Sequence, residues 1–228
     1  MPRKPAKRKS AAGAQEASLT ERAYDSLEEL IVTLQLPPGS AVSETALSQR
    51  LGIGRTPIRE ALQRLARERL VTILPRRGII VSEINVKSQL RLLEVRREVE
   101  RLVAKSAARR ALPAERARFL EIARSFEKSA KSGDEVTFMR VDREYNELTV
   151  LASRNEFAAG AMSLVHSLSR RFWYIHYKQA ADMPRAAKLH ADVARGIGNA
   201  DEKAAALASD RLLDYIEQFT RDTVNADS

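Results

Sequence analysis

Residues 43–78 read SETALSQRLGIGRTPIREALQRLARERLVTILPRRG, and this stretch decides the fold of the chain. Apolar residues recur at helical spacing over 43–51, and Gly52 and Gly54 interrupt the pattern before a second helical segment begins. The apolar residues of that second segment form one stripe: Ile58, Leu62 and Leu65. Two short helices joined by a glycine-containing turn make a helix-turn-helix unit, which is the structure that this stretch predicts.

The second helix of this unit begins with a polar turn. Arg55, Thr56 and Arg59 lie off its apolar stripe. Pro57 suits a helix start, because the first turn leaves its N–H groups unpaired. In a helix-turn-helix protein such a turn meets base edges in the major groove, where an arginine fork can bind guanine. The pattern therefore indicates a recognition helix. The alternative is an amphipathic helix with solvated arginines in a protein that never binds DNA.

The segment after this helix reads as a small two-stranded wing. Residues 70–74 and 79–81 are rich in β-branched and aliphatic residues, and the turn between them carries the adjacent cations Arg76 and Arg77. Arginines at the tip of such a wing can reach phosphates or the minor groove. The residues that we expect to contact DNA are Thr45, Arg55, Thr56, Arg59, Arg76, Arg77 and Gly78.

A family resemblance supports this interpretation. The run GRTPIREALQRLARERLV followed by PRRGIIV resembles the winged-helix signature of GntR-type bacterial transcription regulators. The preceding LTERAYDSLEELIVTLQLPPGSAVSETALSQRLGI resembles the first two helices of that domain, so the resemblance covers residues 18–84. Two positions depart from the family: Gly54 stands where Ser is usual and removes a possible cap or phosphate contact, and Arg69 stands where Gly is usual and adds a cation.

The composition of the chain limits its class. Its 228 residues, 44% of them hydrophobic, suffice for two modest domains with real cores. No apolar run is long enough for a membrane span, and no apolar segment follows the N-terminal cations, so we expect a cytoplasmic protein without a secretory signal. The absence of cysteine excludes disulfides, thiolate metal sites and cysteine nucleophiles. The net charge of +9 suits a polyanionic partner, although the placement of the arginines says more than the total.

We expect a mainly α chain in three parts. Residues 1–17 form a basic arm without apolar periodicity, which we interpret as disordered and either bound to phosphates or solvated. Residues 18–84 form the winged helix-turn-helix domain, which opens with a helix over 19–35. Residues 85–225 form an all-α antiparallel bundle for effector binding and dimerisation. Its helical segments, separated mostly by Pro and Gly, are 86–111, 113–131, 134–152, 156–180, 184–199 and 201–224.

Four polar residues of the predicted bundle are candidates for a ligand site, because bundles often hold ligands between facing helices. They are Arg96, Asp142, Asn146 and His190. Asp142 and Asn146 share one helix face, and His190 lies on the apolar face of its helix. Each has a structural alternative: Arg96 can pair with Glu100 on the surface, and Asp142 with a neighbouring arginine. Asn146 can be a surface amide, and His190 a satisfied core histidine.

The second half resembles the all-helical FCD effector domain of the FadR-type branch of the same regulators. The matching segments are LLEVRREVERLVAKSAA, DREYNELTVLASRNEF and LHADVARGIGNADEKAAALASDRLL. In that branch an Asp-x-x-x-His pair and two further histidines gather a divalent metal that helps to bind a carboxylate effector. Asp142 and His190 match two of these ligands, whereas Asn146 and Leu212 stand where histidines would be.

These two departures bear on the metal. Leu cannot ligate a metal, and an amide oxygen is a poor ligand for Zn or Ni. We therefore expect no cofactor and no tightly bound metal, with a metal held by Asp142 and His190 as the alternative. The resemblance implies an effector pocket that contains Arg96, Asp142, Asn146, His190 and Leu212. Arg96 would capture a carboxylate, and Leu212 would favour a larger or more apolar effector.

The sequence thus predicts a DNA-binding transcriptional repressor that works as a homodimer on a palindromic operator and responds to a carboxylate effector. The alternative is an architectural nucleic-acid-binding protein that needs no effector. Enzymatic activity is not expected, because no Ser/His/Asp grouping, Gly-rich phosphate loop or metal-grade His pair occurs. We expect the aromatic run FWYIHY at 172–177 to serve packing more than the pocket, and we assign no role to His166 or His176.

Overall fold

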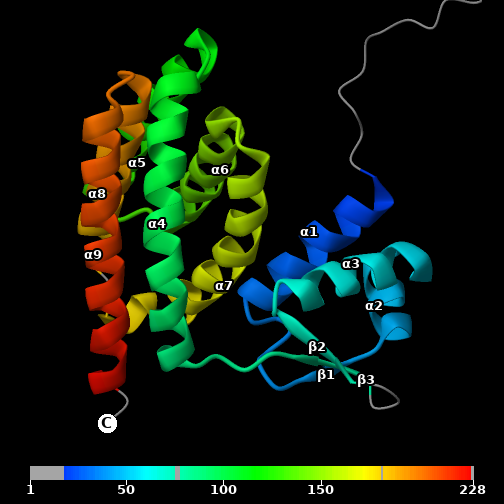
Figure 1. The fold of residues 1–228 in the computed structure, drawn as a ribbon. Coiled ribbons are helices and arrows are strands. Elements are labelled where there is room, and N and C mark those ends of the chain that lie inside the picture. Colours follow the sequence, from blue (N-terminus) through cyan, green and yellow to red (C-terminus); the bar gives the residue numbers. More distant parts are fainter. Residues whose placement is uncertain (1–17, 75–77, 181, 227–228) are drawn as a thin grey trace, which may run out of the picture.

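The computed structural model describes residues 18–74, 78–180 and 182–226. Within these ranges the chain forms nine helices and one three-stranded sheet, with a winged-helix unit beside a helical bundle (Figure 1). The winged-helix unit contains α1 (Leu19–Val32), β1 (Ala41–Val42), α2 (Glu44–Leu51), α3 (Arg55–Arg67), β2 (Val71–Leu74) and β3 (Gly78–Val81). The bundle contains α4 (Val86–Arg110), α5 (Pro113–Ser132), α6 (Glu135–Ser153), α7 (Glu156–Ala180), α8 (Met183–Gly198) and α9 (Glu202–Ala226).

Local sequence signals set the helix ends of the winged-helix unit. Ser18 caps α1 through a reciprocal pair with Glu21, in which each side chain accepts a hydrogen bond from the other residue's backbone N–H. Ser43 caps α2, and Gly52 ends it in the left-handed region at φ 64°. The apolar stripe of α3 is buried in the core of this unit together with residues of α1. The predicted helix-turn-helix is confirmed.

Helix α1 is shorter than its apolar periodicity predicted. The helix ends at Val32 instead of residue 35, and Leu34 has a φ of 62°. A residue in the left-handed region cannot continue a right-handed helix. Pro37 and Pro38 then follow and prevent the helix from resuming.

The sheet of the winged-helix unit has one strand more than the sequence predicted. The strands are antiparallel in the order β1-β3-β2, with Ala41 opposite Ile80 and Thr72 also opposite Ile80 from the other side. The predicted two-stranded wing is present as the β2–β3 hairpin, and β1 adds a third strand on the other side of β3. The additional strand β1 has only two residues, which is too short for an alternation of apolar and polar side chains to be recognised.

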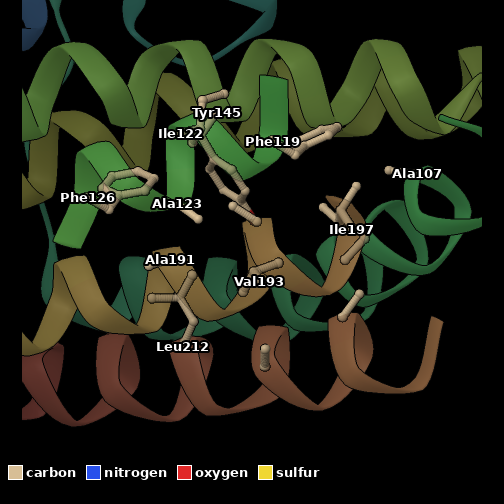
Figure 2. Packing of buried hydrophobic residues seen from close by; sticks show 14 of the residues in the cluster. Ala107, Phe119, Ile122, Ala123, Phe126, Tyr145, Ala191, Val193, Ile197 and Leu212 are labelled. Atoms are coloured by element: carbon tan, nitrogen blue, oxygen red, sulfur yellow. The ribbon is translucent and has the colours of Figure 1, made fainter. Parts of the chain in front are cut away.

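The six helices of the bundle begin and end within two residues of the predicted segments. Their shared core is built from aromatic side chains of α5 and α6 and from small and branched residues of α8 and α9 (Figure 2). Helices α8 and α9 pack so closely that a Cβ atom on Gly196 would lie 2.7 Å from the backbone nitrogen of Ala205. Glycine is therefore required at this crossing, because no side chain fits there.

The two units meet where α1 lies against α7. Arg170 of α7 forms an ion pair with Glu28 of α1. The next residue, Arg171, donates a hydrogen bond to the carbonyl oxygen of Ser82, which follows β3. Among the described residues, no helix has the length and apolar character needed to span a membrane.

Candidate DNA interface and ligand cavity

The first turn of α3 presents its polar residues to solvent. Arg55, Thr56 and Arg59 are exposed, whereas the opposite face of the same helix is buried. This separation follows from the helical spacing of the apolar stripe, which turns every residue off the stripe outward. Gly54 caps the helix without a side-chain hydrogen bond, so the N–H groups of the first turn are not covered by a capping side chain. The surface offers two guanidiniums, a hydroxyl and a helix N-terminus to an anionic partner.

Glu44 of α2 orients the arginines of this turn. The Nε and Nη2 atoms of Arg59 donate to the two carboxylate oxygens of Glu44 at 2.9 and 2.8 Å. Arg55 lies farther away, with its Nη2 atom 3.8 Å from Glu44 Oε2. The hydrogen bond from Arg59 lowers the pKa of Glu44 below its usual value, although burial opposes this shift. A carboxylate thus occupies the edge of the Arg59 fork that a guanine or a phosphate would use.

Two further residues expected to contact DNA are also exposed. Thr45 is exposed at the start of α2. Gly78 is exposed at the start of β3, where its φ of 98° lies in a region that L side chains rarely adopt. Arg76 and Arg77 lie outside the described residues, as does the basic arm at 1–17.

The bundle encloses a cavity of about 50 Å³ that brings the four predicted ligand-site residues together. Side chains of α4, α6, α7, α8 and α9 line it, among them Arg96, Asp142, Asn146 and His190. A cavity of this size holds roughly four water molecules, or a ligand with only a few heavy atoms. The helical spacing of these residues could place each on an inward face, but it could not establish that the faces meet at one point.

Asp142 and His190 form a buried pair in this cavity. The Nε2 atom of His190 lies 3.2 Å from Asp142 Oδ1, and its Nδ1 atom lies 2.8 Å from the carbonyl oxygen of Ala186. Both ring nitrogens therefore face oxygen acceptors. Burial raises the pKa of Asp142, but the hydrogen bond with His190 and the charges of nearby cations together hold this pKa below its usual value. The pair is with a histidine, not with the neighbouring arginine that was the alternative.

Arg96 combines the two roles that the sequence left open. Its Nε atom donates to Glu100 at 2.6 Å, so the pair along α4 exists. The pair is not on the surface, however, because Arg96 is only 8% exposed and lines the cavity. A buried guanidinium beside an enclosed space can donate to an acceptor that a ligand brings.

Leu212 lies elsewhere. It is 1% exposed in the hydrophobic core and is not among the residues that line the cavity. Figure 2 shows its side chain rising from α9 toward Ala191 of α8. Leu212 cannot make the cavity more apolar, so the expectation of a larger, more hydrophobic effector loses its basis.

The residues present do not fit the divalent metal of the FadR-type branch. Asp142 and His190 stand together, but no group of three or more His, Cys, Asp or Glu side chains suitable for a metal occurs among the described residues. Neither of the other two positions supplies a good metal ligand. Asn146 offers only an amide at the cavity wall, and Leu212 lies in the hydrophobic core.

Several lining residues were not predicted from the sequence. His166, Ser169 and Arg170 of α7 face the cavity, and burial lowers the pKa of His166. Nothing near them in the chain marks them as a site, because their partners come from other helices. Trp173 was expected to serve packing. It lines the cavity and also packs against Phe219, with ring centroids 4.7 Å apart.

Comparison with known proteins assigns both units. Residues 19–81 match the family described as bacterial regulatory proteins, gntR family, and residues 91–215 match the FCD domain. YdhC of Bacillus subtilis, an HTH-type transcriptional regulator, is 26% identical over 146 residues, covering 64% of this chain and 65% of that protein. RspR of Escherichia coli, an HTH-type transcriptional repressor, is 33% identical over 90 residues, covering 40% of each chain.

A regulator from an unstable DNA locus of Streptomyces ambofaciens is 44% identical over 62 residues, covering 27% of this chain and 26% of that protein. The aligned segments thus span between about a quarter and two-thirds of these three curated relatives. Among solved structures, McbR/YncC of E. coli has a TM-score of 0.77 at 17% identity and covers 91% of this chain and 99% of that chain. A putative GntR regulator from Rhodococcus sp. RHA1 has a TM-score of 0.66 at 20% identity, with coverages of 90% and 99%. At these identities the likeness concerns the fold.

Proposed function

Because the chain belongs to the gntR family of bacterial regulatory proteins and carries an FCD domain, we propose that it is a sequence-specific repressor controlled by a small carboxylate. The observation that carries the DNA-binding part is the exposed first turn of α3, where Arg55, Thr56 and Arg59 stand opposite a buried stripe. That turn enters the major groove, and Thr45 and Gly78 approach the DNA backbone beside it. Repression is supported by the similarity to RspR, which is described as a repressor. A regulator of this kind works in the bacterial cytoplasm.

The chemistry of the cavity supports an anionic effector. Arg96 and Arg170 line it, and guanidinium groups can only donate hydrogen bonds. The Nε atom of Arg170 and the Oγ atom of Ser169 are buried and have no hydrogen-bond partner in the described part of the chain. A ligand that supplies acceptors satisfies these donors, and a carboxylate does so with two oxygens. The cavity volume of about 50 Å³ favours a small compound over a long acyl chain.

A homodimer is supported by an apolar face of α4. Its four residues recur at heptad-like spacing: Leu92, Val95, Val99 and Leu102. Val95 is 55% exposed and Leu102 is 48% exposed, so α4 presents large apolar side chains to solvent in the single chain. Such a stripe packs against the same stripe of a second copy around a two-fold axis. Two winged helices then face two half-sites of a palindromic operator.

Selection of bound duplexes from a random DNA library by the full-length protein tests this proposal. A palindromic motif with two half-sites one helical turn apart, or a multiple of that spacing, is expected to enrich. An effector-independent architectural protein would instead retain all sequences alike. Its affinity would fall uniformly as salt rises, because only phosphate contacts would contribute. Absence of any enriched motif would refute sequence-specific recognition.

A further inference from the structure

Arg170 belongs to two structures at once: the wall of the cavity and the contact between the two units. Its Nη1 atom donates to both carboxylate oxygens of Glu28 in α1, at 2.8 and 3.0 Å, and its Nη2 atom approaches Glu29 at 3.4 Å. The side chains of Arg170 and Glu28 are only 15% and 5% exposed. The pair is therefore shielded from water, unlike the exposed contacts of Arg143 with Asp25 at the same junction.

The guanidinium of Arg170 also has a donor available to a ligand in the cavity. Arg170 lines the cavity beside Asp142 and His166, and its Nε–H group is buried without a hydrogen-bond partner among the described residues. The preceding residue, Ser169, also lines the cavity, is 8% exposed and has an unpartnered Oγ atom. Two adjacent donors thus lack acceptors at the point where α7 separates the cavity from α1. Buried donors without acceptors are unfavourable, so an acceptor placed here is bound strongly.

We propose that an anion in the cavity competes with Glu28 for Arg170, so that effector binding loosens α1 from α7 and releases the winged-helix unit. The anion is held by two N–H groups of Arg170, its unpartnered Nε–H and a terminal group that now points to Glu28 or Glu29, together with the hydroxyl of Ser169 and the guanidinium of Arg96. As the Arg170 side chain turns to the anion, Glu28 is left as a buried carboxylate without its guanidinium. That state is unfavourable unless α1 moves and Glu28 gains water. The coupling needs no change in the fold of either unit, only a difference in affinity between the joined and released states.

This inference rests on the proposed effector cavity, and one binding experiment separates the two. The full-length wild-type protein, Glu28→Gln and Asp25→Asn are titrated calorimetrically with acetate, oxalate and malonate. Glu28→Gln removes the competing charge and is expected to bind the tightest of these anions about tenfold more strongly than the wild type. Asp25→Asn removes a charge of the same helix whose one ion pair within the described residues is with Arg143, and the affinity of this variant is expected to stay within about twofold of the wild type.

Hydrogen exchange of the wild type gives a second readout that needs no variant to fold. Amides of α1 are expected to exchange faster when the anion is bound, while amides of the α8–α9 crossing stay protected. If an anion binds with the same affinity to Glu28→Gln and to the wild type, and hydrogen exchange of α1 is unchanged, the coupling is wrong, whereas the proposed effector cavity is retained. If α1 becomes better protected, the sign of the coupling is wrong and the proposal falls. If none of the three anions binds any variant, the carboxylate site and the coupling both fail.

Discussion

Replacement of Arg59 by Ala tests the recognition helix. Arg59 lies in the first turn of α3, its side chain is 54% exposed, and its only described ion pair is with Glu44. The Nε and Nη2 donors of its fork are held by that carboxylate, so a guanine of the operator must displace Glu44 from them to bind bidentately. Loss of one bidentate base contact is expected to weaken binding to the selected operator roughly ten- to hundredfold.

The size of this effect must depend on sequence. Arg59→Ala is expected to lose affinity for the operator while its affinity for a shuffled duplex falls much less, which fluorescence anisotropy at two salt concentrations measures. Arg67→Ala removes the same charge from an exposed position in the last turn of the same helix, away from the first turn, and serves as the matched control. Equal weakening on operator and shuffled DNA would show that Arg59 contacts only phosphate, and the assignment of α3 as the reading helix would be refuted.

Three further predictions concern packing, assembly and metal. Gly196→Ala places a methyl group against the backbone of α9 and is expected to destabilise the protein by about 1–3 kcal/mol. Gly160→Ala is the control, because the space around Gly160 is open, and it is expected to leave the thermal unfolding midpoint unchanged or to raise it. Equal unfolding midpoints for the two variants would contradict the close packing at Gly196. Val95→Glu is expected to convert the dimer to a monomer, which light scattering measures. Val136→Glu changes a residue of α6 that is 81% exposed and is expected to leave the dimer intact. If Val95→Glu stays dimeric, this face of α4 is not the dimer interface. Native mass spectrometry is expected to show a dimer without a divalent metal, and a metal that a chelator removes would show that Asp142 and His190 retain the site.

The local sequence was sufficient for most of the fold. Each helix of the bundle has its own apolar period, and residues such as Pro113 at the start of α5 and Gly133 at its end mark its bounds, which therefore follow from residues near in the chain. The errors occurred where the local signal was weak or misleading. Strand β1 is held by its partner Ile80 rather than by its own two residues, and the turn at Leu34 interrupts an apolar pattern that continues beyond it.

The site was predicted only as far as the resemblance reached. Arg96, Asp142 and His190 were found because each sits on an inward face or matches a family position, and the structure brings them to one cavity. Arg170 could not be found in this way, because its partner Glu28 is 142 residues away and belongs to the other unit. Leu212 shows the reverse error: the family resemblance placed this position in the ligand site, whereas its side chain lies in the hydrophobic core. Residues that act across a junction between units are visible only after the units are placed together.

The most direct test of the account is the affinity of the full-length protein for its selected operator with and without acetate, oxalate or malonate. The wild type is expected to bind DNA about tenfold more weakly in the presence of the anion that fits the cavity. A variant with Arg96→Gln and Glu100→Gln removes both charges of one buried pair and is expected to lose this response while still binding the operator. An unchanged operator affinity with every anion, or an equal response in the variant, would contradict control of the DNA-binding unit from this cavity.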